Sequence, residues 1–494
     1  MQVKAFLCGC ITPKLLDNYR HHLSHLPATW SSKVMVHSIP RRSFLKATAF
    51  SLGSGAIGPA FQNLLASEDN HRKSSGYGKL RPTVDKSTGL KLLELPEGFS
   101  YRSFGWTGDQ MDGGAITPGV HDGMGVIDEQ DGIITLCRNH EIKRASSPWG
   151  KPEITYDANA GGGCTNLRFD ANSGEWLNAW PSLSGTVKNC AGGPTPWNTW
   201  LSCEESVLGP GGVDDDEVFD FHEHHGWVFE VPADGDASAK PIHSMGRFVH
   251  EAIAIDPDTG IVYETEDRGT AGFYRFIPNK AGALAEGGKL EMLCVKGQED
   301  LRKFGRVGAT FDCIWVPIDD PEKAHADEKK QDELGCYTQG KQHGATTFAR
   351  LEGCWFGNDS IYFDATSGGP VGSGQIWKFD PRTQTLTLLF ASPAKEILDS
   401  PDNLAVSPRG GIILCEDGDL IPQRLHGLTS QGELFTFAKN IVQLQGEHNG
   451  FKGDFRGSEW AGATFSADGK WLFVNLQKPG ITFAITGPWG TDLL

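Results

Sequence analysis

The chain has 494 residues, of which 38% are hydrophobic, and a formal net charge of -17 at pH 7. Such an acidic chain is poorly suited to nucleic acid or to an anionic membrane surface, so we expect neither as a stable partner. The 62 glycines, 27 prolines, 14 tryptophans and 27 phenylalanines indicate short strands joined by tight turns around a layered core.

The N-terminal segment, 1–66, is interpreted as an export leader. Pro40-Arg41-Arg42-Ser43-Phe44-Leu45-Lys46 precedes a weakly apolar stretch that runs from Ala47 to about Phe61. Twin arginines before such a stretch are typical of a twin-arginine signal, and the stretch is too short to stop in a membrane. The alternative is a chance basic pair before an amphipathic helix. The leader predicts the twin-arginine translocase as a partner, a periplasmic or extracellular location, and no membrane attachment after processing.

A linker is expected over 67–89, followed by one domain over 90–494. From about residue 90 an alternating strand, a turn with Asp, Pro or Gly, and a second strand recur along the chain. Turns of this kind lie at 169–174, 255–260, 379–382, 406–410 and 465–469. Regular hairpins predict an all-β protein, a β-propeller whose length fits six blades best, and a two-sheet sandwich array is the alternative.

Two segments interrupt this pattern and are expected to be exposed loop insertions. Residues 209–226 contain His222-Glu223-His224-His225, and residues 318–335 are rich in Lys, Asp and Glu. The histidine cluster could bind a metal, but its charged neighbours favour a surface role.

Acidic residues cluster where the expected strands end. These clusters are Asn139-His140-Glu141, Cys203-Glu204-Glu205, His250-Glu251-Ala252, Glu264-Thr265-Glu266-Asp267, Arg350-Leu351-Glu352 and Cys415-Glu416-Asp417. In a propeller such ends converge on the axis, where the carboxylates would repel one another unless cations neutralised them. Carboxylates suit calcium, and a thiolate such as Cys164 suits a softer metal such as iron. The alternative is that each acid caps a loop or pairs with a nearby base.

Arg350 and Glu352 are alternate residues, so they would face the same side of a strand. A guanidinium beside a metal-bound carboxylate could bind a phosphate oxygen. An internal Arg–Glu salt bridge is the alternative.

These motifs together resemble the PhoX alkaline phosphatases over about residues 90–490. The resemblance rests on the twin-arginine leader, Cys137-Arg138-Asn139-His140-Glu141, Gly163-Cys164-Thr165, His250-Glu251-Ala252, Thr265-Glu266-Asp267, Arg350-Leu351-Glu352-Gly353, Ser400-Pro401-Asp402-Asn403, Trp460-Ala461-Gly462 and Asn475-Leu476-Gln477-Lys478-Pro479-Gly480.

The resemblance implies a six-bladed propeller with Fe3+ and Ca2+ around a bridging oxo group. It implies an exported phosphatase that hydrolyses small phosphate esters through a metal-bound oxo or hydroxo nucleophile. The sequence leaves the substrate range open among monoesters, diesters, which would require phosphodiesterase activity, and nucleotides. By that resemblance Cys164, Glu251 and Glu352 match the iron-binding positions, and Arg350 matches the phosphate-binding arginine. Catalysis is therefore expected from Arg350, Glu352 and Cys164, with Cys164 as an iron thiolate. The candidate calcium ligands are Glu141, Glu204, Glu266, Asp402 and Glu459.

Two other functions compete with this one, and the protein is expected to be a monomer in each case. A calcium-dependent propeller lactonase or phosphotriesterase would also place acids around an axial metal, but it would need neither Cys164 nor iron. A non-catalytic binding propeller would hold calcium for structural reasons alone.

Overall fold

The structure is a computed structural model that describes residues 76–494 except 145, 215–216, 324–334 and 491–492. These residues belong to a unit that spans Ser67–Leu494. The expected leader lies outside the described residues, as does the first part of the expected linker. Among the described residues no helix is both long and apolar enough to cross a membrane.

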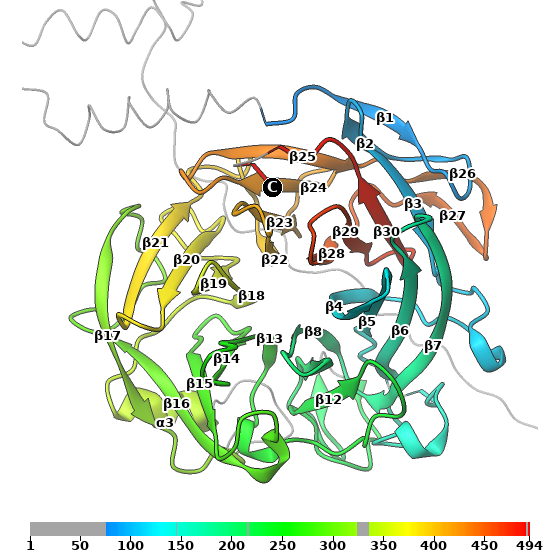
Figure 1. Cartoon of the computed structure of the whole chain (residues 1–494). Helices are drawn as coiled ribbons and strands as arrows, with labels where there is room; N and C mark the ends of the chain where they lie inside the picture. The colour runs from blue at the N-terminus through cyan, green and yellow to red at the C-terminus, as the bar shows by residue number, and fades with distance from the viewer. Residues whose placement is uncertain (1–75, 145, 215–216, 324–334, 491–492) are drawn as a thin grey trace, which may run out of the picture. The chain divides into compact units, whose positions relative to one another are not determined.

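Six inner strands form a closed ring around the axis of this unit. They are β4 (His121–Gln130), β8 (Asn189–Pro194), β13 (His250–Ile255), β18 (Leu351–Gly357), β22 (Pro401–Val406) and β28 (Trp460–Phe465). Each contacts the next, and β28 returns to β4. Figure 1 shows the sheets arranged radially around these strands, so the expected six-bladed β-propeller is confirmed.

The remaining strands extend each blade outward by antiparallel pairing. The first blade adds β5 (Ile133–His140), β6 (Gly162–Asp170) and β7 (Glu175–Thr186); the second adds β9 (Thr199–Glu204) and β12 (Val228–Pro232). The third adds β14 (Val262–Glu266), β15 (Phe273–Pro278), β16 (Gly288–Val295) and β17 (Thr310–Pro317); the fourth adds β19 (Ser360–Ala365), β20 (Gln375–Asp380) and β21 (Thr385–Ala391). Because β17 pairs with both β16 and β21, these two blades form one nine-stranded sheet.

The last two blades include strands from the start of the described chain. The fifth consists of β22, β23 (Ile412–Glu416), β24 (Arg424–Leu428), β25 (Leu434–Asn440), β2 (Lys91–Pro96) and β1 (Leu80–Val84). The sixth consists of β28, β29 (Leu472–Leu476), β30 (Ile481–Thr486) and β3 (Ser100–Phe104). The pairing of β3 with β30 joins an early and the last strand of the described chain and closes the ring. Part of the expected linker is thus the strand β1.

Short elements lie in the connections within and between the blades. They are η1 (Asp112–Gly114), η2 (Pro152–Ile154), β10 (Val213–Asp214), β11 (Glu217–Val218), η3 (His243–Met245), η4 (Leu284–Glu286), α3 (Gly335–Gln342), β26 (Gln443–His448) and β27 (Phe451–Asp454). The insertion expected over 209–226 holds β10 and β11. The insertion expected over 318–335 lies mostly outside the described residues.

The expected hairpin turns are present and have a clear local cause. In the turn between β13 and β14, the carboxylate of Asp256 accepts a hydrogen bond from the amide of Asp258 (3.1 Å). The amide of Gly260 donates to the carbonyl of Asp256 (2.8 Å), and Gly260 has φ +71°. This left-handed conformation is accessible to glycine at little cost. Turns of this kind set the antiparallel register that places the inner strand ends around one axis.

Candidate active site

A β-bulge interrupts every inner strand, and it positions the side chains of the site. The pairing register shifts between His121 and Met124, Asn189 and Gly192, His250 and Ile253, Leu351 and Cys354, Pro401 and Asn403, and Ala461 and Thr464. A bulge bends the strand locally and redirects one side chain. In five blades the residue inside the bulge lines a common cavity: Asp122, Cys190, Glu251, Glu352 and Asp402.

The second strand of four blades supplies another acid, at the first position after the strand ends. These residues are Glu141 after β5, Glu205 after β9, Asp267 after β14 and Asp417 after β23. The cavity has a volume of about 170 Å³ and is lined by these nine residues together with Glu459, Lys188 and Arg350. Nine carboxylates and one thiol therefore share a small cavity with two cationic side chains.

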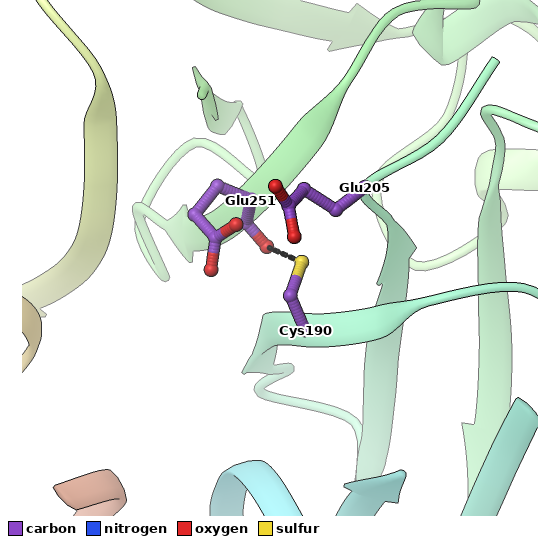
Figure 2. Close-up of side chains that lie close together, drawn as sticks. All are labelled: Cys190, Glu205 and Glu251. Carbon is purple, nitrogen blue, oxygen red and sulfur yellow. Dashed lines mark hydrogen bonds between the residues drawn. The ribbon is translucent and has the colours of Figure 1, made fainter. Parts of the chain in front are cut away.

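One group of potential metal ligands contains the thiol. Cys190, Glu205 and Glu251 each have one ligand atom within 4.8 Å of the others. Figure 2 shows the three side chains together, with the Cys190 thiol donating to the Glu251 carbonyl (3.8 Å). The same thiol also donates to the carbonyl of His250 (3.3 Å). Burial, followed by the charge of Glu251, raises the pKa of the Cys190 thiol well above its ordinary value.

A second group is made of oxygen ligands alone. Asp122, Glu141 and Glu459 also have one ligand atom each within 4.8 Å of the others. The side-chain amide of Gln477 donates to Glu141 Oε2 (2.7 Å) and to Glu459 Oε1. Because Gln477 directly follows β29, the sixth blade places an amide where four other blades place an acid.

Arg350 forms ion pairs with two further acids of the cavity, and its backbone lies in the left-handed region (φ +44°). Its Nε and Nη2 donate to the two carboxylate oxygens of Asp267 (2.8 and 3.0 Å), and Nη2 also donates to Glu352 Oε1 (2.6 Å). The charge of Glu352 raises the pKa of Arg350, with Asp267 adding to the effect. The side chain remains 41% exposed, so the guanidinium can also reach a bound ligand.

Burial and mutual repulsion act against ionisation of the acids. The pKa values of four of them are raised well above the ordinary range: Asp122, Glu251, Glu352 and Glu459. Burial raises the pKa of Glu205 to about 8, and burial with the charge of Asp417 raises that of Asp402 to about 8. Such acids ionise together only when cations neutralise them, so the cavity has the electrostatic character of a multi-metal site.

A profile of the family described as alkaline phosphatase PhoX matches residues 75–179 and 177–480. The chain belongs to the alkaline phosphatase PhoX family. Among solved structures, Pseudomonas fluorescens PhoX in complex with vanadate, a transition-state analogue, is 18% identical with a TM-score of 0.59, over 83% of this chain and 97% of that one. A gluconolactonase from Xanthomonas campestris is 14% identical with a TM-score of 0.39, over 83% and 98% of the two chains. Comparison with curated protein sequences gives no significant match.

In this PhoX family member the cavity brings together six of the residues expected from the sequence. They are Glu141, Glu251, Arg350, Glu352, Asp402 and Glu459. Cys164, Glu204 and Glu266 lie elsewhere. The other lining residues are of two kinds: Asp122, Lys188 and Cys190 were missed by sequence reasoning, whereas Glu205, Asp267 and Asp417 stand in the predicted acidic clusters but were not chosen as ligands.

Cys164 is buried in the first blade, outside the cavity lining. It belongs to an apolar cluster with Ile127, Leu183 and Trp200. Its thiol donates to Oδ1 of Asn139 (3.1 Å). Cys164 is therefore not among the residues that line the cavity, and the cavity's thiol comes from Cys190.

Glu204 and Glu266 are each the last residue of a strand, and the residue after each one enters the cavity. Because successive side chains alternate in direction, neighbouring acids face opposite sides. Glu204 accepts hydrogen bonds from the amide of Val187 (2.9 Å) and from His225 Nδ1 (2.6 Å). Glu266 accepts hydrogen bonds from the amide of Gly272 and from Tyr274 Oη, both at 2.8 Å. Glu204 therefore has partners on both carboxylate oxygens, whereas both bonds to Glu266 fall on Oε2 and its Oε1 has no partner among the described residues.

The residues of the histidine cluster 222–225 differ in their exposure to solvent. Three of its residues are exposed, which agrees with the expected surface role, but His225 is fully buried. Its ring lies between Glu204 (2.6 Å) and Asp157 (3.4 Å). The two carboxylates raise the pKa of His225 to about 9, against burial, which alone would lower it.

Proposed function

We propose that this chain is a metal-dependent alkaline phosphatase that hydrolyses phosphate esters and releases inorganic phosphate. The observation that carries the proposal is a single cavity in which nine carboxylates and one thiol surround an arginine with unused donors. Membership of the PhoX family supports the reaction class. The vanadate in the Pseudomonas fluorescens structure is named there as a transition-state analogue, which agrees with a phosphoryl substrate.

The two ligand groups fit two kinds of metal ion. A thiol with two carboxylates, as at Cys190, Glu205 and Glu251, suits iron, whereas the all-oxygen group suits Ca2+. Metal binding would also release the proton of the buried thiol, since coordination needs the thiolate. When bound, such ions neutralise the acids, hold phosphate oxygens and activate the attacking water.

Positioning is the protein's own contribution to this reaction. Phosphoryl transfer depends mainly on alignment and on charges placed around the transferring oxygens. Arg350 is fixed by Asp267 and Glu352 through Nε and Nη2, and these bonds leave the Nη1 hydrogens for a phosphate oxygen. The bulge that carries Glu352 is itself held from the third blade, because Thr265 Oγ1 donates to the carbonyl of Glu352 (2.6 Å). The site is therefore built on ordered strand ends.

The proposal is tested with purified protein and p-nitrophenyl phosphate. We expect hydrolysis at alkaline pH, its loss on treatment with a chelator, its recovery with Ca2+, and iron in the purified protein by elemental analysis. Hydrolysis of bis(p-nitrophenyl) phosphate, measured alongside, reports the diester activity. Lactone hydrolysis without iron or phosphatase activity would favour the lactonase alternative, and no hydrolysis at all would favour a binding propeller.

We also propose export by the twin-arginine pathway, to the periplasm or beyond the cell. This proposal rests on Arg41 and Arg42 before an apolar stretch. Replacing both arginines by lysine is expected to retain the protein in the cytoplasm. Unchanged export of that variant would contradict the proposal.

A further inference from the structure

Lys188 lies beside the cavity in an unusual backbone conformation. It follows β7 and immediately precedes β8, with φ +52° in the left-handed region. Its amide donates to the carbonyl of Ile142, and its carbonyl accepts from the amide of Glu205, both at 3.0 Å. A lysine in this conformation is disfavoured, so the neighbouring strands must hold it there. The backbone from which its side chain projects is therefore held in place by the fold.

The ammonium group of Lys188 spans the two groups of potential metal ligands. Nζ lies 2.5 Å from Glu205 Oε2 in the thiol-containing group and 3.4 Å from Glu141 Oε1 in the all-oxygen group. The side chain is 24% exposed and lines the cavity. An ammonium has three donors, so these two partners leave one N–H of this cavity-lining side chain for a ligand.

Arg350 is the other cation of the cavity, and it belongs to a different blade. Lys188 precedes the inner strand of the second blade and Arg350 precedes that of the fourth, with the β13 blade between them. Both lining cations therefore retain donors that the acids do not use. A phosphate group placed between them would meet fixed positive charge from two directions.

We propose that Lys188 is a second phosphate-contacting residue and that it favours phosphate monoesters over diesters. This inference rests on the proposed function and names a substrate preference within it. At alkaline pH a monoester carries two negative charges on its phosphoryl oxygens, whereas a diester carries one. A second fixed cation therefore stabilises the monoester more strongly.

The test compares Lys188→Met, Lys188→Gln and Lys188→Arg with the natural protein. We measure kcat and KM for p-nitrophenyl phosphate and bis(p-nitrophenyl) phosphate, inhibition by inorganic phosphate, and bound metal. Loss of one charge-assisted hydrogen bond is expected to weaken phosphate inhibition and monoester kcat/KM by about tenfold to a hundredfold. The diester should be affected less, metal content should be unchanged, and the arginine variant should recover part of the loss.

Lys151→Met is the matched control, because Lys151 forms an ion pair with Asp236 (2.7 Å) outside the cavity lining. The inference fails if phosphate inhibition and the ratio of monoester to diester hydrolysis are the same in the Lys188 variants as in the natural protein. It also fails if those variants lose metal and phosphate affinity recovers on reloading, since Lys188 would then be only a counter-ion of the acids. Where Lys188→Met does not fold, the glutamine variant, which keeps a donor without charge, gives the same readout.

Calorimetric binding of inorganic phosphate separates this inference from the proposed function. If the natural protein hydrolyses no phosphate ester but binds phosphate more tightly than Lys188→Met, the proposed activity fails and the Lys188 contact stands. If hydrolysis is present and the variant binds phosphate equally well, the activity stands and the Lys188 contact fails.

Discussion

Two buried cysteines of neighbouring blades, Cys190 and Cys164, differ in the groups that lie around their thiols. Cys190 lies in the β8 bulge, and its thiol is grouped with Glu205 and Glu251. Cys164 is paired with Asn139 in the middle of a sheet. Its thiol donates a hydrogen bond to the side-chain oxygen of Asn139. The sequence Asn189-Cys190-Ala191 has the same form as His250-Glu251-Ala252, with cysteine at the position of the acid. That likeness is a signal by which Cys190 could have been found.

The two cysteines give opposite expectations on substitution. Cys190→Ser should lose bound iron and at least about a hundredfold in kcat, because a hydroxyl is a much weaker ligand for a soft metal than a thiolate. Cys164→Ser should retain both, since a hydroxyl can still donate to Asn139. Iron analysis and initial rates on the two purified variants distinguish them. Loss of iron from Cys164→Ser alone would return the ligand role to Cys164.

Asn139 connects these two cysteines through buried hydrogen bonds. Its amide nitrogen donates to the carbonyls of Cys190 (3.2 Å) and Ala191 (2.7 Å). Its oxygen accepts from Cys164 Sγ, and from Trp200 Nε1 and Ser202 Oγ at 3.0 Å each. A fully paired buried network of this kind fixes one geometry. Asn139 thus holds the bulge from which the Cys190 thiol projects.

Asn139→Ala should therefore lower both stability and iron content. It removes two bonds to the bulge and leaves three buried donors without an acceptor, which costs about 2–4 kcal/mol in free energy of unfolding. The matched control is Asn440→Ala. Asn440 is also fully buried, donates to the carbonyls of Phe455 (2.7 Å) and Ser458 (3.3 Å), and lies outside the cavity lining.

Chemical denaturation and iron analysis of both variants provide the measurement. Both should unfold at lower denaturant concentration, but only Asn139→Ala should lose iron when saturated with metal. Equal iron content in the two variants would show that Asn139 supports the fold alone.

At the level of the strand, the sequence predicts which blade ends carry acids but not which acid of a pair enters the cavity. In Glu204-Glu205 and in Glu266-Asp267 the second acid faces the cavity, because the strand ends at the first one. A shift of one residue exchanges the two faces of a strand. The exact strand end and the bulge depend on contacts between blades, which a single sequence does not reveal. Glu251 and Glu352, which the resemblance assigned, each stand alone in their motifs, so no neighbouring acid could be taken in their place.

The loop that follows β9 is held by a buried ion triad. His225 lies between Glu204 and Asp157, and the Asp157 carboxylate also accepts from the amides of His222 (2.7 Å) and Glu223 (2.9 Å). These contacts connect the insertion over 209–226 to the segment before β6. The three side chains are buried, so their charges must be balanced within the triad.

This triad predicts a loss of stability at high pH. The folded pKa of His225, about 9, lies above the unfolded value of 6.5. Its contribution is therefore complete below about pH 6.5 and is lost as the pH rises through about 9, with a magnitude of up to about 3 kcal/mol. We expect the difference in free energy of unfolding between the natural protein and His225→Gln to decrease from pH 6 to pH 10.

Denaturation at a series of pH values measures this difference, in which other titrating groups largely cancel. His243→Gln is the control, because His243 has a carboxylate partner, Glu322, at 3.3 Å but is 48% exposed. An exposed pair of this kind contributes little, so its difference should stay near zero throughout. A difference for His225→Gln that does not change with pH would contradict the ion triad.

Across the whole molecule, closure of the ring is what brings the acids together. Each blade contributes only one to three of the cavity residues, so none of the ligand groups is complete within a single blade. Regular hairpins were enough to predict the propeller, because local turns and alternation determine each sheet. The strand pairing that closes the ring joins residues almost 400 positions apart, and it leaves no local pattern in the sequence.

Removal of strands from the N-terminal side should therefore have graded effects. Relative to a chain that begins at Leu80, one that begins at Asp85 loses only β1, the outermost strand of a six-stranded sheet, and should unfold cooperatively at a slightly lower temperature. A chain that begins at Gly105 also loses β2 of the fifth blade and β3, whose Tyr101 and Ser103 pair with Ile485 and Phe483 of β30. That loss exposes the edge of β30 and the apolar cluster around Phe483, and an exposed edge of this kind promotes aggregation. Thermal unfolding and size-exclusion chromatography should show a folded monomer for the first truncation and aggregate for the second. A folded, metal-binding monomer without β3 would show that the ring holds without its closing strand.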